Sequence, residues 1–303
     1  MKFAVTGGAG FVGSHLVKKL ISDGNKVIVI DNLKTGKKEN LGTHIQNIEF
    51  VQGDIRDYNL LEDSFRNVDG VFHQAALASV PDSFHMPDEY HSVNVTGTEN
   101  IFKLATQIGF KVVYASSSSV YGNPIKTPIS EDHQKKPINP YAKTKLDDEE
   151  LAQKYTAQGA KIIGLRYFNI FGEGQSKEYA GVIKKFLENI YNNKPPIVNG
   201  DGLQARDFVY VEDVVRANLL AMDSTVKHAF INIGTNASVT IIDLAERIIR
   251  ISGLSLKPVH GSSLEGDVRH SEADISLAKR LLNWEPKTTL YDWLKIAIPA
   301  KLN

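Results

Sequence analysis

The stretch "KFAVTGGAGFVGSHL", residues 2–16, constrains the fold of this chain more than any other. A short apolar run that predicts a strand leads into a glycine-rich loop, and a helical pattern follows directly. Gly7, Gly10 and Gly13 allow a tight turn that brings backbone N–H groups against an anion at the start of the helix. In this strand–loop–helix context the glycines predict a dinucleotide-binding fold.

Apolar runs and helical patterns alternate through the first half of the chain. Helices are predicted at 12–24, 59–67, 89–109 and 141–159. Strands are predicted at 2–6, 26–31, 48–54, the start of 69–76, 111–117 and 161–167. Continuous apolar strands separated by helices predict a parallel sheet with helices on both faces, an α/β class of fold.

This alternation ends near residue 168, where segments rich in glycine, proline and asparagine begin. We assign residues 1–168 to a Rossmann-type, doubly wound domain that binds the cofactor. Residues 169–303 form a smaller C-terminal lobe for the substrate, and 208–234 cross back to the sheet. Within this second half, helices are predicted near 181–192, 212–222, 240–252, 274–282 and 290–298.

The composition excludes several classes of function. Lys plus Arg number 35 and Asp plus Glu number 35, so no net positive field favours nucleic acid or an anionic membrane. Without cysteine there is no disulfide or thiolate chemistry. The histidines show no metal-ligand spacing, and we predict no metal. No apolar run approaches the ~20 residues of a membrane span, and we expect a cytoplasmic protein.

Asp31 ends the second predicted strand, 18 residues after Gly13. A carboxylate at this place can accept hydrogen bonds from the adenosine ribose and repels a 2′-phosphate. The alternative is a carboxylate that only caps a turn. The position therefore predicts NAD as the cofactor in preference to NADP.

Tyr141 and Lys145 share one face of a helix that begins at Pro140. A tyrosine is a poor base at its ordinary pKa of about 10, but a lysine ammonium and an oxidised nicotinamide would both favour the phenolate. The serine-rich segment "YASSSSVYG", 114–122, ends a strand, and ligands bind at such strand ends. We interpret this pair as an acid/base. Tyr291 and Lys295 have the same spacing but lie in an amphipathic terminal helix without a serine-rich strand end, and we expect this lysine to be solvated.

Taken together, these segments resemble the extended short-chain dehydrogenase/reductase family, in its nucleotide-sugar epimerase/dehydratase branch. The resemblance covers nearly the whole chain and is closest to the short 4-epimerases of UDP-hexoses. It implies bound NAD, a nucleotide-sugar substrate, and a homodimer formed through helices 89–108 and 141–158. The segments that carry it include "TGGAGFVGSHL", "GDIRD", "FHQAALASV", "VNVTGTENI", "SSSSVYG", "PYAKTK", "LRYFNIFG", "GDGLQARDFVYVEDV" and "GDVRHSEADIS".

The resemblance implies a role for each matching position. Tyr141 would be the acid/base, Lys145 would position and charge it, and Ser117 would orient the substrate hydroxyl. The residues that would contact the cofactor are Tyr141, Lys145, Gly7, Gly10, Phe11, Val12, Asp31, Asn32, Lys34, Thr35, Gly36, Asp54, Ile55, Gln74, Ala75, Ala76 and Asn94. The nucleotide sugar would meet Tyr141 and Ser79, Ser117, Ser119, Asn169, Val182, Arg206, Arg269 and Ser271.

Several functions within this family stay open. Dehydratases of the branch carry an Asp–Glu pair where this chain has Ser118 and Ser119, which disfavours water elimination. A decarboxylase, a reductase and a non-catalytic NAD-sensing protein are further alternatives. Ser271 stands where a tyrosine excludes N-acetylated sugars, so both plain and N-acetylated UDP-hexoses are expected to enter. Asn199 and Leu264 depart from the family pattern and leave the nucleotide base open.

Overall fold

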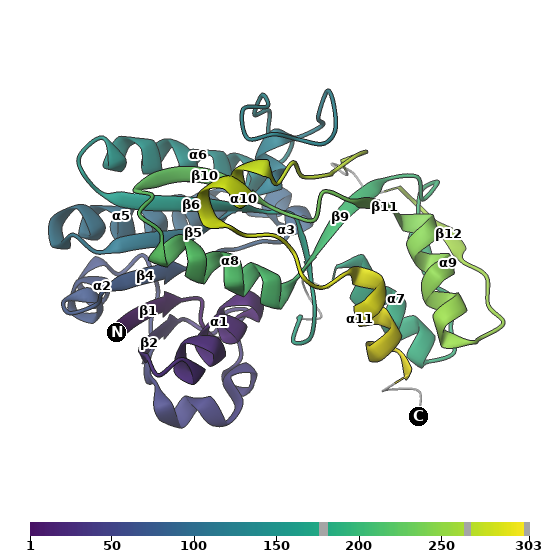
Figure 1. Ribbon diagram of the computed structural model, residues 1–303, viewed down its shortest axis with the longest axis horizontal. Helices are drawn as coiled ribbons and strands as arrows, with labels where there is room; N and C mark the ends of the chain where they lie inside the picture. Colours follow the sequence, from purple (N-terminus) through teal and green to yellow (C-terminus); the bar gives the residue numbers. More distant parts are fainter. Residues whose placement is uncertain (176–180, 264–267, 300–303) are drawn as a thin grey trace.

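The central element of the protein is a seven-stranded sheet, seen in a computed structural model that describes residues 1–175, 181–263 and 268–299 (Figure 1). Its strands are β1 (Lys2–Thr6), β2 (Lys26–Asp31), β3 (Glu49–Gln52), β4 (Gly70–His73), β5 (Lys111–Ser117), β6 (Lys161–Tyr167) and β10 (His228–Ile233). They are all parallel and run in the order β10–β6–β5–β4–β1–β2–β3. This order, which reverses beside β1, confirms the doubly wound Rossmann-type fold.

Two hydrophobic cores cover the two faces of this sheet because successive side chains of a strand point to opposite sides. Along β2, Val27 and Val29 pack on one face, and Ile28 and Ile30 on the other. The first core includes residues of α1 (Phe11–Ser22), α8 (Val211–Asp223) and α10 (Ser276–Leu282). The second includes residues of α2 (Tyr58–Phe65), α5 (Gly97–Ile108) and α6 (Pro140–Thr156).

The helix predicted over 89–109 is present but not uniform. The chain is helical from α4 (Pro87–Tyr90) through a π-helical segment, η2 (His91–Thr96), into α5, and Gly109 ends it with a φ of 94°. Asn94, in the π-helical segment, is buried and bonds to both the N–H and the C=O of Leu77. Because π segments are rare and depend on tertiary contacts, the sequence pattern did not reveal this one.

The second half of the chain adds short strands that the sequence did not predict. β7 (Asn169–Phe171), β9 (Ala205–Tyr210) and β11 (Ser238–Thr240) form one small sheet, and β8 (Ile197–Asn199) pairs with β12 (Val259–Gly261). Around a third core pack α7 (Val182–Tyr191), α9 (Ile241–Ser252) and α11 (Leu290–Ala297), which lie together in Figure 1. The predicted helices of this half are all present. After β9, the chain returns through α8 to β10 in the central sheet, whereas the domain boundary at 168 stays a prediction.

Shorter helical segments complete the fold. They are η1 (Lys38–Asn47), α3 (Val80–His85) and η3 (Ser118–Tyr121). In the part of the chain that the structure describes, no helix is both long and apolar enough to cross a membrane.

Candidate active site

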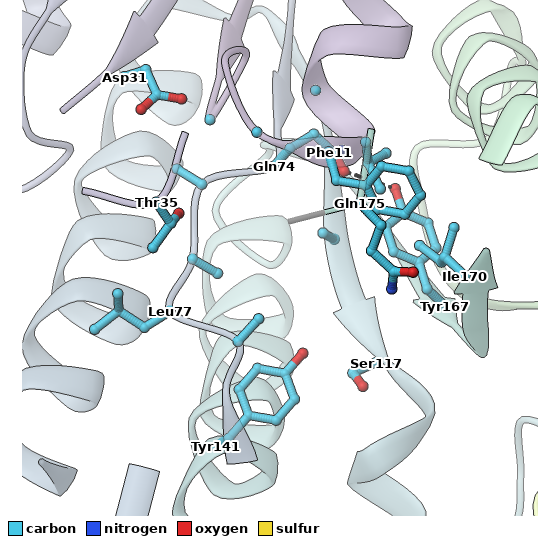
Figure 2. A pocket seen from close by; sticks show the side chains of 18 of the residues that line it. Phe11, Asp31, Thr35, Gln74, Leu77, Ser117, Tyr141, Tyr167, Ile170 and Gln175 are labelled. Carbon is cyan, nitrogen blue, oxygen red and sulfur yellow. Dashed lines mark hydrogen bonds between the residues drawn. The ribbon is translucent and has the colours of Figure 1, made fainter. Parts of the chain in front are cut away.

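A cavity of about 440 Å³ opens at the carboxyl ends of the central strands (Figure 2). Parallel strands end at the same edge of a sheet, and the topology reverses here between β1 and β4, so this is where the fold places a ligand. Asp31 lies at one end of the cavity, and Tyr141 and Ser117 lie at the other. Residues of the glycine loop and the proposed acid/base pair, Tyr141 and Lys145, therefore line the same cavity.

Most of the predicted cofactor and catalytic residues line this cavity. They are Gly7, Gly10, Phe11, Val12, Asp31, Asn32, Lys34, Thr35, Ile55, Gln74, Ala75, Ala76, Ser117, Tyr141 and Lys145. Two predicted substrate residues, Asn169 and Val182, line it as well. Their roles remain predictions, but the fold brings them together.

The glycine loop packs too closely for side chains. Gly7 has a φ of +68°, and a Cβ on it would lie 2.6 Å from the backbone nitrogen of Ala75. A Cβ on Gly13 would lie 2.1 Å from the carbonyl oxygen of Gly7. Gly10 is the N-cap of α1 without a side-chain cap, and Phe11 and Val12 of the first turn line the cavity. An uncapped helix N-terminus at a cavity wall suits a pyrophosphate, so the residues present fit a dinucleotide.

Asp31 is buried beside the glycine loop. Its carboxylate accepts hydrogen bonds from the N–H groups of Ala9 (3.0 Å) and Leu33 (2.8 Å). Burial raises its pKa, while both of these bonds lower it. Gly36 lies outside the cavity lining but against Asp31, because a Cβ on it would be 2.8 Å from Asp31 Oδ2. Asp31 therefore caps a turn and also lines the cavity, so the two interpretations of it are compatible.

An ion-pair network stands beside the Asp31 end. Asp54, also outside the lining, accepts hydrogen bonds from Asn32 Nδ2 (3.0 Å) and from Arg56 Nη2 (2.8 Å). Arg56 lowers the pKa of Asp54 to about 2. Glu89 bonds both Lys34 (3.0 Å) and Arg56 (3.2 Å). Asp54 thus positions Asn32, which does line the cavity.

The side chain of Gln74, which follows β4, is held by hydrogen bonds to Tyr167 and Asn218. Its amide oxygen accepts a hydrogen bond from the hydroxyl of Tyr167 (3.2 Å), and its amide nitrogen donates to Asn218 of α8 (3.1 Å). The side chain is therefore fixed before any ligand enters.

The opposite end of the cavity contains the serine–tyrosine–lysine group. The side chain of Asn139 caps α6 by accepting from the N–H of Ala142 (2.8 Å), which sets the first turn that carries Tyr141. Ser117 Oγ accepts hydrogen bonds from Ser119 N (3.2 Å) and Ser119 Oγ (2.9 Å). Ser119 does not line the cavity but orients Ser117, which does.

Lys145 is 3 % exposed, and its Nζ donates to Oδ2 of Asp148 at 3.2 Å. The next residue, Glu149, makes a two-pronged pair with buried Arg166 on β6 (2.7 and 2.8 Å). Ser116 on β5 also donates to Glu149 (2.8 Å). These buried bonds fix α6 against β5 and β6 and so fix the position of Tyr141 and Lys145.

His73, at the end of β4, makes hydrogen bonds to two threonines. Its ring nitrogens lie 2.7 Å from Thr6 Oγ1 and 2.8 Å from Thr98 Oγ1. Burial, with a smaller contribution from the charge of Lys145, lowers its pKa to about 3. The imidazole is therefore neutral near pH 7.

Two other predicted residues support the lining from behind. Asn94 holds Leu77 by its backbone N–H (2.8 Å) and C=O (3.0 Å). Ser79 caps α3 by accepting from Asp82 N (3.3 Å). Leu77 lines the cavity, so Asn94 acts on the cavity through it.

The remaining predicted substrate residues lie outside the cavity lining. Arg206 is buried and donates to the carbonyl of Ala205 (2.7 Å). Arg269 makes two bonds to the carboxylate of Asp201 (2.9 and 2.8 Å) at the surface. Ser271 is buried, and its N–H donates to Ala205 O (3.1 Å). Leu264, one of the two departures from the family pattern, lies outside the described residues.

Sequence reasoning missed part of the lining. Phe168 follows directly after β6, and this position at a strand end was the available signal, whereas Ile170 lies in β7. Leu77 and Phe208 lie in segments that carry the family resemblance but were given no role, and Gln175 lies outside those segments; the fold brings all three to the cavity. Asp148, the partner of Lys145, was not singled out either.

Residues 3–234 match the NAD dependent epimerase/dehydratase family. A putative UDP-glucose 4-epimerase of Methanocaldococcus jannaschii is 40% identical over 96% of this chain and 95% of its own length. UDP-glucuronic acid decarboxylase 1 of Arabidopsis thaliana is 36% identical over 97% of this chain and 68% of its own length.

Solved structures are similar over the same extent. The UDP-glucose 4-epimerase of Thermotoga maritima with UDP-glucose has a TM-score of 0.94 and 38% identity, covering 99% of this chain and 98% of that one. A UDP-N-acetylglucosamine 4-epimerase of Methanobrevibacter ruminantium, in complex with UDP-N-acetylmuramic acid, has a TM-score of 0.93 and 36% identity, covering 98% and 97%. The glycine loop, the sheet order and these matches lead to one conclusion: the chain belongs to the NAD dependent epimerase/dehydratase family.

Proposed function

We propose that this protein is an NAD-dependent 4-epimerase of UDP-hexoses. The observation that carries the proposal is the position of Ser117, Tyr141 and Lys145 at one end of a cavity whose other end holds Asp31. The similarity to 4-epimerases of UDP-sugars supports it. An intact acid/base group also argues against a protein that only senses NAD.

The residues of this chain divide the work between proton transfer and binding. NAD, when bound, supplies a hydride acceptor and donor for carbon 4 of the sugar. Tyr141 takes the proton of the 4-hydroxyl group and later returns one to the same oxygen, while Ser117 orients that oxygen. The positive charge of Lys145 favours the phenolate form of Tyr141. Inversion requires that the oxidised sugar turn over in the site, and the apolar side chains of Ile170, Val182 and Phe208 in the wall cannot hold its hydroxyls.

A dehydratase needs an acid beside the sugar, and the described lining offers none there. Asp31 is the single carboxylate among the described cavity-lining residues, and it lies at the opposite end from Ser117. Ser119 occupies one of the two acidic positions of dehydratases, and its hydroxyl donates to Ser117. This arrangement favours oxidation and reduction at carbon 4 without loss of water.

A decarboxylase must bind the carboxylate of a sugar acid. Within the described part of the lining, the cationic side chains are Lys34 and Lys145. Lys34 pairs with Glu89, and Lys145 pairs with Asp148. A neutral hexose therefore fits this lining better than a sugar acid does.

Two finer points belong to the proposal. We expect NAD in preference to NADP because of Asp31. We also expect N-acetylated UDP-hexoses to be accepted because Ser271 is small, although Ser271 is not among the lining residues. The ratio of kcat/KM for UDP-N-acetylglucosamine to that for UDP-glucose tests the second point. A selective fall of this ratio in Ser271→Tyr supports it, and an equal loss of both substrates contradicts it.

A homodimer through α5 and α6 is also part of the proposal. The apolar side chains of Ile101, Phe102 and Leu104 are buried within the protomer. The contact between copies would therefore use the outward face, which carries the Lys154–Glu99 pair (3.2 Å). Light scattering at micromolar concentration tests it, and a monomeric mass contradicts it. Location in the cytoplasm likewise stays a prediction.

The experiment that tests the function follows two signals at once. The purified protein is incubated with UDP-glucose, UDP-galactose or UDP-glucuronate, and the sugars and the absorbance of reduced nicotinamide are both measured. Interconversion of the two hexoses without accumulation of reduced cofactor supports the epimerase. Steady accumulation of reduced cofactor would identify an oxidoreductase, and carbon dioxide from UDP-glucuronate would identify a decarboxylase.

A further inference from the structure

Helix α6 carries two adjacent carboxyl groups in opposite settings. Asp147 pairs with Lys143, whose side chain is 56% exposed. Asp148 is completely buried, and its Oδ2 accepts from Lys145 Nζ at 3.2 Å. Its second oxygen, Oδ1, accepts no hydrogen bond from the described residues. A buried carboxyl group with an unused acceptor costs free energy of folding. The contact of Asp148 with Lys145 points to a role for this carboxyl group at the acid/base pair.

The groups around Asp148 leave Lys145 as its ionic partner. Glu149 is engaged by Arg166, and His73 is bonded to two threonines. The Thr98 hydroxyl of α5 faces the Asp148 carboxyl group and lowers its pKa. The titratable groups whose charges couple to that of Asp148 are Lys145 and Asp147 on α6 and Tyr114 on β5. The elements packed against α6 also carry Arg166 on β6, Glu99 and Lys103 on α5 and Glu89 on α4.

We propose that Asp148 is a positioning residue for the acid/base pair. It holds the Lys145 ammonium at the cavity wall and, when ionised, offsets the charge that this ammonium presents to Tyr141. The inference rests on the proposed function, in which Tyr141 is the base. It goes beyond that function by assigning a counter-charge to Lys145 that the serine–tyrosine–lysine group does not include.

The charge of Asp148 changes in the pH range in which the enzyme would work. Burial raises its pKa to about 7, against the opposing effect of Lys145. Below that pH the carboxyl group is neutral, and the full charge of Lys145 favours the phenolate of Tyr141. Above it the carboxylate offsets part of this charge and favours the phenol. Asp148 therefore opposes the ionisation of Tyr141 as the pH rises.

The test replaces the charge and keeps the shape. In Asp148→Asn, the acidic limb of the pH profile of kcat/KM for UDP-glucose should move to lower pH by on the order of one unit. Asp147→Asn is the matched control on the same helix, and its profile should stay in place. A limb that stays where it is in Asp148→Asn, or that moves to higher pH, overturns the proposal. A lower melting temperature with an unmoved limb would show a structural role only and also overturns it.

A second readout does not depend on turnover. The tyrosinate absorbance of the NAD-loaded protein is titrated with and without Tyr141→Phe, and the difference isolates Tyr141. Asp148→Asn should shift this difference titration to lower pH, and the shift should vanish in a Lys145→Met background. If Asp148→Asn shifts the difference titration but the wild-type protein does not interconvert the hexoses, the proposed function is rejected and this inference stands. Equal titrations in wild type and Asp148→Asn reject the inference whatever the activity.

Discussion

Two tyrosine–lysine pairs with the same spacing lie on two different helices of this protein. On α6, Tyr141 lines the cavity, and the side chain of Lys145 is 4% exposed and pairs with buried Asp148. On α11, Tyr291 packs at the edge of the third core with the guanidinium of Arg247 4.2 Å from its ring centroid. Lys295 is 67% exposed, and its Nζ lies 3.4 Å from the equally exposed Asp292.

The comparison shows that spacing places two side chains on one helix face but does not make them a site. On α6, burial removes water from Lys145, so its charge acts on its neighbours through a medium that screens little. On α11, solvent surrounds the lysine and screens its charge. The four predictions below test whether this difference in surroundings governs the two pairs.

The largest effect is expected from removing the two tyrosine hydroxyls in turn. Tyr141→Phe should lower kcat for UDP-hexose interconversion by roughly 10²–10⁴-fold, because the proton-transfer group is lost. Tyr291→Phe should leave kcat within about twofold, since its hydroxyl is not in the cavity. Retention of more than about a tenth of wild-type turnover in Tyr141→Phe would mean that the phenolate is not the base.

The two lysines should differ in the same direction. Lys145→Met keeps an unbranched apolar chain but removes the charge that favours the phenolate, so kcat should fall by about 10²-fold. Lys295→Met should leave kcat unchanged. Both variants are assayed at saturating UDP-glucose, and similar activities in the two would remove the distinction between the pairs.

A third prediction probes the buried setting of Lys145 through His73. The unfolded chain binds a proton at this histidine below pH 6.5, but the folded protein does not do so until about pH 3. The free energy of unfolding should therefore fall as the pH drops through this window, by up to about 1.4 kcal/mol per pH unit from this group. His73→Asn should lose that slope, whereas His85→Asn, at an exposed histidine, should keep it. Denaturant titrations between pH 4 and 7 measure both slopes, and equal slopes in wild type and His73→Asn would contradict the prediction.

The smallest effect is expected at the exposed pair. Lys295→Met should change the free energy of unfolding by less than about 0.5 kcal/mol, because an exposed ion pair contributes little and is screened by salt. Urea unfolding at low and high salt measures it. A loss above about 1 kcal/mol that salt abolishes would show that the α11 pair is stronger than its exposure implies.

The cofactor half of the site was largely predictable. Gly7 and Gln74 follow strands of the same parallel sheet and Asp31 ends one, so a strand pattern in the sequence places them at one edge. Ser117 and Tyr141 were predicted for the same reason, from a strand end and a helix start. The substrate half was harder, because Arg269 and Ser271 lie in irregular segments whose partners, Asp201 and Ala205, are distant in the sequence.

The sequence by itself determined the alternation of strands and helices, the glycine loop and the spacing of Tyr141 and Lys145, because each depends on residues close together in the chain. Only the tertiary structure decided which of the two lysines is buried and what faces it. The Thr98 hydroxyl faces Asp148 because α5 packs against α6, and no local pattern encodes that contact. The strength of a charge depends on the medium around it, and folding creates that medium.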